Sequence, residues 1–232
     1  MQPSVRAQAL GKRFGKKWAL AHVELEVAKG EGLLVVGDNG SGKTTLLRLL
    51  AGLLRPTLGS VEILGDAPQV AGGSARGKLS LVGHQGYLYD ALTPFETLSL
   101  WNRLLGGGRS ASDLERLVAE AGLAPDRDSR VHGFSAGMRK RLSLTRLRLE
   151  EPRVVLLDEP FSALDKAGRL WLKTMLLELR EGGSSLLIAS HDPDRAASLC
   201  DRSLRLEQGQ IVWQGGVGEP GERATDGPGS GR

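Results

Sequence analysis

The hydrophobic positions of this chain follow two patterns, and together they predict an α/β fold. Three short apolar runs, at 33–36, 154–157 and 186–189, are typical of strands buried on both faces of a parallel sheet. Segments with helical spacing lie between the strand-like runs, most clearly over 43–53 and 166–181. Strands that alternate with helices in this way indicate a parallel sheet covered by helices.

Other regions depart from that alternation. The polar and apolar residues of 22–27 alternate as in a half-buried strand, which predicts an antiparallel opening at the start of the chain. Residues 86–150 are mostly helical in pattern and are expected to form a helical lobe. Beyond Gly215 the chain is rich in Gly, Pro and charge without periodicity, so we expect one domain over 1–217 and a disordered tail over 218–232. The remaining predicted elements are strands over 4–10, 19–28, 60–64, 79–83, 203–206 and 210–214, and helices over 96–105, 111–121 and 194–200.

A glycine-rich segment with the pattern G-x-x-x-x-G-K-T follows the first buried run directly and precedes a helix. Its glycines let the backbone turn so that several N–H groups and the positive end of the helix face one anion. A nucleoside triphosphate is the natural occupant, with Lys43 at the β- and γ-phosphates and the Thr44 hydroxyl at Mg²⁺. The residues predicted to bind the nucleotide here are Gly37, Asn39, Gly40, Ser41, Gly42, Lys43, Thr44 and Thr45.

Two carboxylates come at the end of the second buried run. Asp158 ends the predicted strand and Glu159 follows it. The carboxyl ends of parallel strands are where open α/β sheets bind ligands, so Asp158 is expected near Mg²⁺. Glu159, just off the strand, is placed to orient or deprotonate a water for in-line attack on the γ-phosphate.

Composition and charge restrict the protein class. The 31 Lys and Arg against 27 Asp and Glu give a net charge of +4, which is too small for a nucleic-acid footprint. No apolar run approaches the eighteen or so residues of a membrane span, and the start of the chain lacks a signal-peptide pattern. A single cysteine, Cys200, excludes an internal disulfide and is predicted to be an inert helix residue. We therefore expect a cytoplasmic protein.

The densest basic cluster follows a predicted helix start at Ser135. Its members are Arg139, Lys140, Arg141, Arg146 and Arg148. A charged cluster at helical spacing is most often a solvated helix face, and that is the prediction here.

Four further segments carry a resemblance to a known family. Residues 134–141 resemble the signature motif of ATP-binding cassette (ABC) proteins, and 162–165 resemble the D-loop after the catalytic glutamate. Residues 186–192 resemble the strand that ends in the switch histidine, here His191, and Gln85 stands where the family keeps its Q-loop glutamine. The resemblance covers about residues 5 to 215, with every motif in family order.

This resemblance implies a P-loop NTPase (RecA-like) core with an N-terminal antiparallel β subdomain and an inserted helical subdomain over 86–150. It also implies that two cassettes, as a homodimer or with a second cassette, pair head to tail around ATP. Glu159, His191 and Gln85 would then be catalytic, with Mg²⁺ held by Thr44, Gln85 and Asp158. The other chain would contribute Ser135 and Gly137, and Asp165 of the D-loop would lie at the nucleotide.

The match departs from the family at several positions. Phe134, Ala136 and Met138 replace the usual leucine, glycine and glutamine. Loss of that glutamine removes a polar contact at the ribose end of the site. Phe14 resembles the aromatic residue that stacks on adenine, with Trp18 as a nearby substitute; the alternative is a core or rim aromatic of the first hairpin.

The implied function is an ATP hydrolase subunit that powers export through a separate integral membrane permease. It would contact the membrane peripherally through that permease, at the cytoplasmic face of the inner membrane. The short cassette with 82–85 and 134–138 looks most like the haem-exporter ATPase of cytochrome c maturation. It is also similar to the cassettes of multidrug and other exporters. A soluble cassette acting on nucleic acid or the ribosome is the alternative, but those usually carry two cassettes or long insertions. A nucleoside kinase would share only the phosphate loop.

Overall fold

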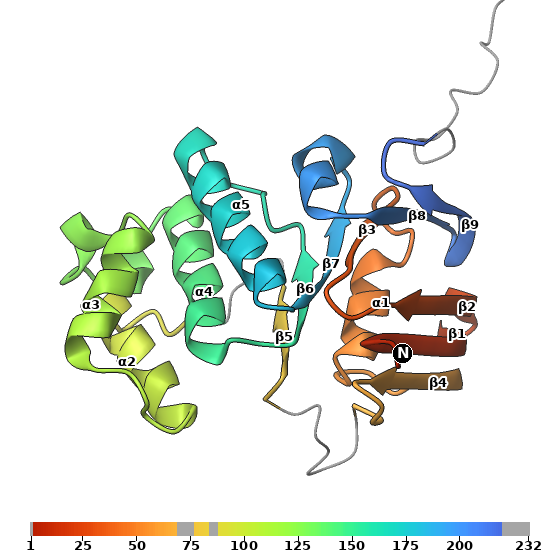
Figure 1. The fold of residues 1–232 in the computed structure, drawn as a ribbon, viewed down its shortest axis with the longest axis horizontal. Coiled ribbons are helices and arrows are strands. Elements are labelled where there is room, and N and C mark those ends of the chain that lie inside the picture. Colours follow the sequence, from red (N-terminus) through yellow and green to blue (C-terminus); the bar gives the residue numbers. More distant parts are fainter. Residues whose placement is uncertain (1, 69–76, 84–87, 220–232) are drawn as a thin grey trace, which may run out of the picture.

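The main sheet of the molecule has six strands in the order β5-β6-β7-β3-β8-β9 (Figure 1). The computed structural model describes residues 2–68, 77–83 and 88–219. All neighbours in the sheet are parallel except β9, which runs antiparallel to β8. Every residue of β3, β6 and β7 is buried, as the apolar runs predict. The strands are β3 (Gly32–Val36), β5 (Leu79–Val82), β6 (Val154–Asp158), β7 (Ser185–Ser190), β8 (Arg202–Glu207) and β9 (Gln210–Gly216).

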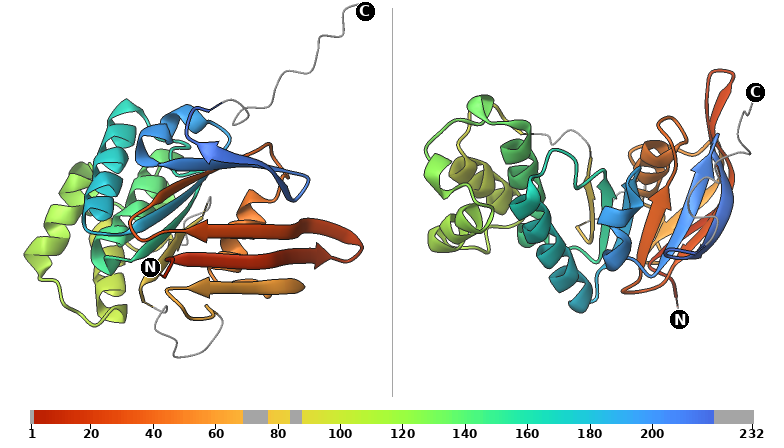
Figure 2. Two further views of the ribbon diagram at one scale, coloured as in Figure 1. Left: turned by 45° about the vertical axis from the view of Figure 1, so that its right-hand side comes forward. Right: turned by 90° about the horizontal axis from the view of Figure 1, so that it is seen from above.

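A second, antiparallel sheet has the order β2-β1-β4. Its strands are β1 (Val5–Phe14), β2 (Lys17–Val27) and β4 (Leu58–Ile63). Helix α1 (Lys43–Leu50) packs between the two sheets, because its leucines belong to a core cluster that contains Leu10 and Val61 from one sheet and Val35 from the other. Figure 2 shows the two sheets in two further views, the second of them from above. The hairpin is longer than predicted at its turn end, while α1 is shorter, since Gly52 takes a positive φ of 71°.

The helical lobe lies at the opposite end of the molecule from this antiparallel sheet (Figure 1). It contains α2 (Pro94–Leu104), α3 (Ala111–Glu120) and α4 (Ala136–Glu150), with a core cluster of its own. Thr93 and Ser110 begin α2 and α3 as capping boxes, and Ser135 caps α4. Helix α5 (Lys166–Glu181) instead covers the main sheet, through Leu172, Met175 and Leu176. The helical lobe and the α/β core match the expected arrangement.

The predicted helix over 194–200 is wrong. Two single 3₁₀ turns, Pro193–Arg195 and Ala197–Leu199, occupy this stretch. Cys200 is extended, not helical, and the next N–H, of Asp201, donates to Gly32 O at 2.7 Å. The chain must enter β8 beside β3 at this point, which leaves no room for a continuous helix.

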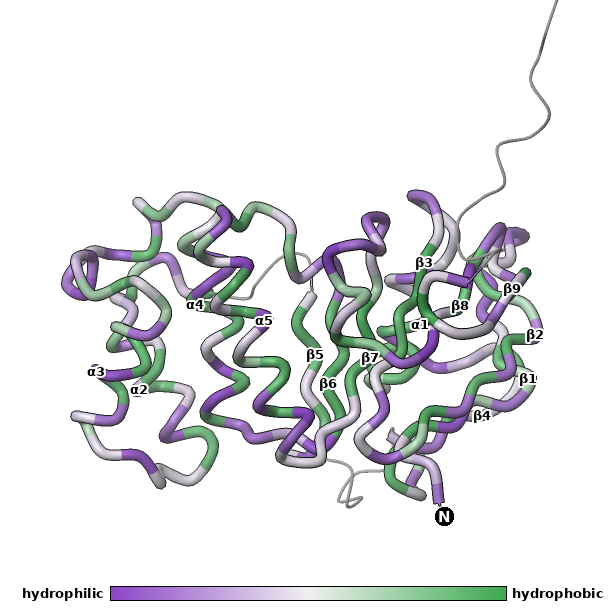
Figure 3. The backbone as a smooth tube through the Cα atoms, turned by 45° about the horizontal axis from the view of Figure 1, so that its top comes forward, coloured by the Kyte–Doolittle hydropathy of each residue, from purple (hydrophilic) through white to green (hydrophobic). Residues whose placement is uncertain are grey.

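Hydrophobic residues concentrate along the central strands (Figure 3). Among the helices that the structure describes, none combines the length and the apolar character needed to cross a membrane. Most of the predicted tail, residues 220–232, lies outside the described residues, as does Gln85.

Candidate functional site

The carboxyl ends of β3, β6 and β7 meet at one edge of the main sheet. The register pairs Val36 with Ser190 and Asp158 with Ala189. The glycine-rich loop after β3, the carboxylates after β6 and the histidine after β7 are therefore brought together. This is the ligand-binding edge of an open α/β sheet.

The glycine-rich loop depends on its glycines for two different reasons. A Cβ on Gly37 would lie 2.3 Å from Leu206 O, and one on Gly42 would lie 2.7 Å from Ala19 O. Both glycines therefore pack so closely on neighbouring backbone that no side chain fits there. Gly40 has a φ of 84° and no atom within 4 Å of its Cβ position. The loop thus has a packed base and an open centre.

Lys43 begins α1 inside this loop. Its Nζ donates to the backbone oxygens of Gly37 and Asp38, at 2.5 and 3.0 Å. The side chain is buried, so the ammonium is held over the loop and close to the N–H groups at the start of the helix. An anion in the loop would meet a cation and a helix N-terminus together.

Two of the three predicted Mg²⁺ residues, Thr44 and Asp158, lie in direct contact, and the third, Gln85, lies outside the described residues. Thr44 Oγ1 donates to Asp158 Oδ2 at 2.7 Å, which links α1 to the end of β6. Within the described ranges, no group of three or more His, Cys, Asp or Glu side chains could hold a metal ion. A hydroxyl and one carboxylate, completed by phosphate oxygens and water, suit Mg²⁺ in nucleotide sites.

Glu159 and His191 form a second pair beside this one. Glu159 Oε1 accepts from the backbone N–H of His191 at 2.8 Å and lies 2.9 Å from His191 Nδ1. Ser190 Oγ contacts Oε2 at 3.3 Å. The Glu159 side chain is 17% exposed and that of His191 is 64% exposed, so the histidine covers a mostly buried carboxylate.

These groups line one cavity of about 1000 Å³. Residues that were not predicted to belong to the site also line it, among them Ser162 of the D-loop segment and Arg146 of the basic cluster. The predicted residues that line it are Asn39, Gly40, Gly42, Lys43, Thr44, Thr45, Asp158, Glu159 and His191. Nine residues predicted from separate motifs therefore share one space.

The phosphate loop fits a polyphosphate by a further observation. Ser41 Oγ is buried and has no hydrogen-bond partner in the described part of the chain. A buried hydroxyl without a partner is costly, and a phosphate oxygen above the loop would satisfy it. The open centre at Gly40 gives such a group room.

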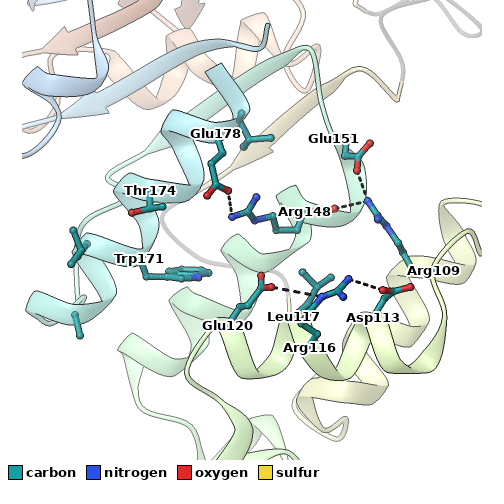
Figure 4. Close-up of a pocket in the computed structure, with 13 residues that line it drawn as sticks. Arg109, Asp113, Arg116, Leu117, Glu120, Arg148, Glu151, Trp171, Thr174 and Glu178 are labelled. Carbon is teal, nitrogen blue, oxygen red and sulfur yellow. Dashed lines mark hydrogen bonds and ion pairs between the residues drawn. The ribbon is translucent and has the colours of Figure 1, made fainter. Parts of the chain in front are cut away.

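A second cavity, of about 810 Å³, lies between α3, α4 and α5 (Figure 4). Its charged side chains pair with one another, for example Arg148 with Glu178 and Arg116 with Asp113 and Glu120. Arg109 likewise pairs with Glu151. All seven charged lining residues are engaged, so this cavity offers a polyphosphate no uncommitted cation.

Outside the glycine-rich loop, four predicted site residues that the structure describes do not line this first cavity of about 1000 Å³. Ser135 Oγ caps α4 by accepting from Met138 N at 3.2 Å. A Cβ on Gly137 would lie 2.8 Å from Ala163 O, so Gly137 packs on the D-loop. Asp165 caps α5 through Gly168 N and pairs with Arg141, and these two contacts lower the pKa of Asp165. Its predicted nucleotide contact remains a prediction.

The fourth is Phe14, near the turn of the first hairpin. Phe14 is 52% exposed and its alternative Trp18 is 38% exposed. Each ring has a cation above it, Lys12 Nζ at 5.2 Å from the first and Arg13 at 5.7 Å from the second. Both aromatic residues are accessible, and the choice between them stays open.

The solvated basic face predicted for α4 is wrong, because its four arginines are half-buried in ion pairs and Lys140 is buried. Lys140 is 5% exposed and its Nζ lies 3.4 Å from Gly83 O. Burial lowers its pKa to about 8, and the charges of Asp158 and Glu159 oppose part of that shift. The sequence spacing could have indicated that Lys140 is buried, because Lys140, Leu144 and Leu147 lie on one face of the helix and both leucines are buried.

Comparison with known proteins decides the family. Residues 20–162 match the ABC transporter family model. The chain belongs to the ABC transporter family. It has the ABC ATPase fold, and ATPases of this family bind ATP with Mg²⁺.

Two relatives illustrate the similarity. The chain is 35% identical over 210 residues to the daunorubicin resistance ATP-binding protein DrrA3 of Streptomyces coeruleorubidus, covering 90% of the chain and 66% of the relative. It is 37% identical over 211 residues to the aliphatic sulfonates import ATP-binding protein SsuB 1 of Burkholderia lata, covering 90% and 63%. The chain thus spans slightly less than two thirds of the length of these ABC relatives.

Solved structures agree with the fold. An ATP-binding subunit of an ABC transporter superposes with a TM-score of 0.82 at 27% identity, covering 92% of this chain and 90% of that one. The ATP-binding cassette MJ0796, described as a dimer bound to ADP and Pi, also gives 0.82, at 23% identity with 92% and 98% covered. The second likeness concerns the fold alone.

Proposed function

We propose that this chain binds ATP with Mg²⁺ at the cavity described above and hydrolyses it to drive a transporter. The observation that carries the proposal is the meeting of Lys43, Thr44, Asp158, Glu159 and His191 around one cavity. In the family such a constellation is used for phosphoryl transfer to water, which depends on positioning and electrostatic stabilisation.

Each residue has a role that its contacts support. Lys43 binds the β- and γ-phosphates, and the loop N–H groups and Ser41 hold the polyphosphate. Mg²⁺, held by Thr44 and Asp158 and by the predicted Gln85, neutralises phosphate charge when bound. Glu159 orients or deprotonates the attacking water, and His191 keeps the carboxylate aimed through its N–H and Nδ1.

The proposed active form is a head-to-tail pair of cassettes. Ser135 and Gly137 do not line the nucleotide cavity of their own chain, but they stand at the start of α4. Helix α4 runs antiparallel to β6, so its amino end faces the same side of the molecule as the phosphate loop (Figure 1). A helix N-terminus presented there suits the γ-phosphate of ATP bound to a second copy.

Hydrolysis would remove the shared ligand and let the pair open. We assign this motion to a separate integral membrane permease, which would hold the chain peripherally at the cytoplasmic face of the inner membrane. The names of the two relatives, one for drug resistance and one for sulfonate import, support a transporter subunit. They do not agree on the direction of transport.

A narrower proposal concerns the cargo. Export of haem for cytochrome c maturation rests on the resemblance of 82–85 and 134–138 to that class of cassette. The relatives' names do not support it. Restoration of c-type cytochromes in a strain that lacks its haem-exporter ATPase tests it, and failure there with a functional chain leaves the broader transporter proposal standing.

ATP turnover by the purified chain is the direct test of the main proposal. We expect Mg²⁺-dependent hydrolysis that Lys43→Ala abolishes together with ATP binding, while Lys29→Ala, at an exposed lysine outside the cavity, leaves both intact. Chelation of the metal should stop turnover. A Lys43→Ala variant that hydrolyses ATP at the wild-type rate would overturn the assignment of this cavity.

A further inference from the structure

One of the two edge strands of the main sheet, β5, presents backbone carbonyls to the outside of the sheet. Lys78 O accepts from Arg153 N and Val154 N, so it points at β6. Carbonyl directions alternate along a strand, which turns Ser80 and Val82 toward β6 and Leu81 outward. By the same alternation the Gly83 carbonyl faces outward, two residues beyond that of Leu81.

Two cations of α4 meet these outward carbonyls. Arg146 Nη2 donates to Leu81 O at 3.0 Å, and Lys140 Nζ donates to Gly83 O at 3.4 Å. Side chains of α4 thereby provide hydrogen-bond donors for carbonyl groups at the sheet edge, which have no neighbouring strand to pair with. Lys140 is the contact nearest the site, because Val82 pairs with Leu157 and Gly83 therefore lies beside Asp158.

The buried ammonium is not explained by stability alone. Lys140 is buried with one long hydrogen bond, and the carboxylates of Asp158 and Glu159 are the charges that act on it. An apolar residue of similar size would avoid the desolvation cost of a buried charge. The position thus keeps a buried cation whose charge interacts with the two carboxylates of the site, at the expense of stability.

We propose that Lys140 is a positioning residue of the ATPase site. Its hydrogen bond to Gly83 O ties the end of β5, which lies beside Asp158 in the sheet, to α4, the helix whose amino end carries Ser135. A shift of that helix is then felt at Asp158 and Glu159 of the same chain. This inference rests on the proposed function, because it assigns a role in ATP turnover.

Kinetics of four variants test the inference. In Lys140→Met we expect kcat to fall about tenfold or more, since small displacements of catalytic groups are costly, while KM for Mg-ATP stays within about threefold. Lys140→Arg, which keeps the charge, should recover most of kcat. Lys140→Gln, which keeps a donor but no charge, should behave like the methionine variant and serves in its place if that variant does not fold.

Arg148→Met is the matched control. It removes another α4 cation, one that is tied to Glu178 at the second cavity, and it should leave kcat and KM unchanged. Equal kcat in wild type and Lys140→Met, or in wild type and Lys140→Gln, overturns the inference alone. So does a loss of kcat that Lys140→Arg does not restore. A wild-type chain that binds no ATP and turns none over overturns the proposed function, and this inference falls with it.

Discussion

Glu159 adopts a backbone conformation that glycine or asparagine would adopt at lower cost. Its φ is 48°, yet its N–H continues the ladder by donating to Ala189 O at 2.9 Å. Left-handed residues of this kind persist where surrounding contacts over-determine them, and they concentrate at functional sites. Here the bend directs the carboxylate off the strand and toward His191.

Replacement of Glu159 tests its catalytic role. Glu159→Gln keeps the size and can still accept from the His191 N–H, but it cannot take a proton, so we expect turnover to fall by about 100-fold or more. ATP with Mg²⁺ should then trap a dimer, which light scattering would detect. A variant that hydrolyses ATP at the wild-type rate would remove Glu159 from the mechanism.

Lys140 predicts a pH dependence of stability. Its pKa is about 8 in the folded protein, against an ordinary value of 10.5 for lysine, so the unfolded chain binds more protons between these two pH values. The free energy of unfolding of wild type relative to Lys140→Met should therefore rise with pH from about 8 to 10.5, by about 3 kcal/mol. Chemical denaturation of both proteins at each pH measures it. A difference that stays constant would contradict a buried charge.

At the scale of elements, the starts of α4 and α5 are locked together. Arg141 of α4 pairs with Asp165, the residue that caps α5, and Gly137 packs on Ala163 just before it. The signature segment and the D-loop of one chain therefore form one unit. A displacement of either segment moves the other, because both helix ends share these contacts.

Substitution of Asp165 tests this junction. Asp165→Ala loses the cap and the ion pair, whereas Asp165→Asn keeps a capping side chain, so the melting temperature should be lowest for alanine. The pKa of Asp165 is lowered in the folded state, so its stabilising effect is present above 3.8, the ordinary pKa of an aspartate, and is lost as the pH falls below that value. The gap between wild type and Asp165→Ala should close on acidification. A pH-independent gap would assign the effect to something other than the carboxylate.

At the scale of the whole molecule, the proposed site is divided between two chains. The phosphate loop and Asp158 belong to the α/β core, and Ser135 begins a helix of the lobe. A chain defective in one half should therefore be rescued by a chain defective in the other. This property distinguishes a shared site from a site complete in one chain.

Mixing two inactive variants makes this measurable. Lys43→Ala lacks the phosphate cation, and Ser135→Asp keeps an N-cap but places a carboxylate against the γ-phosphate. Each alone should be inactive, whereas a mixed pair contains one intact site and should regain part of the turnover. Ser110→Asp, at the equivalent cap of α3, is the control and should remain active alone. Absence of rescue on mixing would contradict the shared site.

The sequence by itself determined the parts of this protein that depend on neighbours along the chain. Fully apolar runs predicted β3, β6 and β7, and the glycine spacing predicted the loop from Gly37 to Lys43, because local sterics and burial of a short strand leave few alternatives. The positions of Asp158 and Glu159 followed from the strand before them.

Tertiary structure alone decided what depends on distant contacts. The 3₁₀ turns at 193–199 replace a helix because β8 must begin beside β3. Lys140 is buried because β5 and the carboxylates after β6 face it, and Glu159 meets His191 because β6 and β7 are neighbours. Short-range patterns fix backbone conformation, whereas the burial of a charge or the meeting of two side chains depends on residues far apart in the sequence.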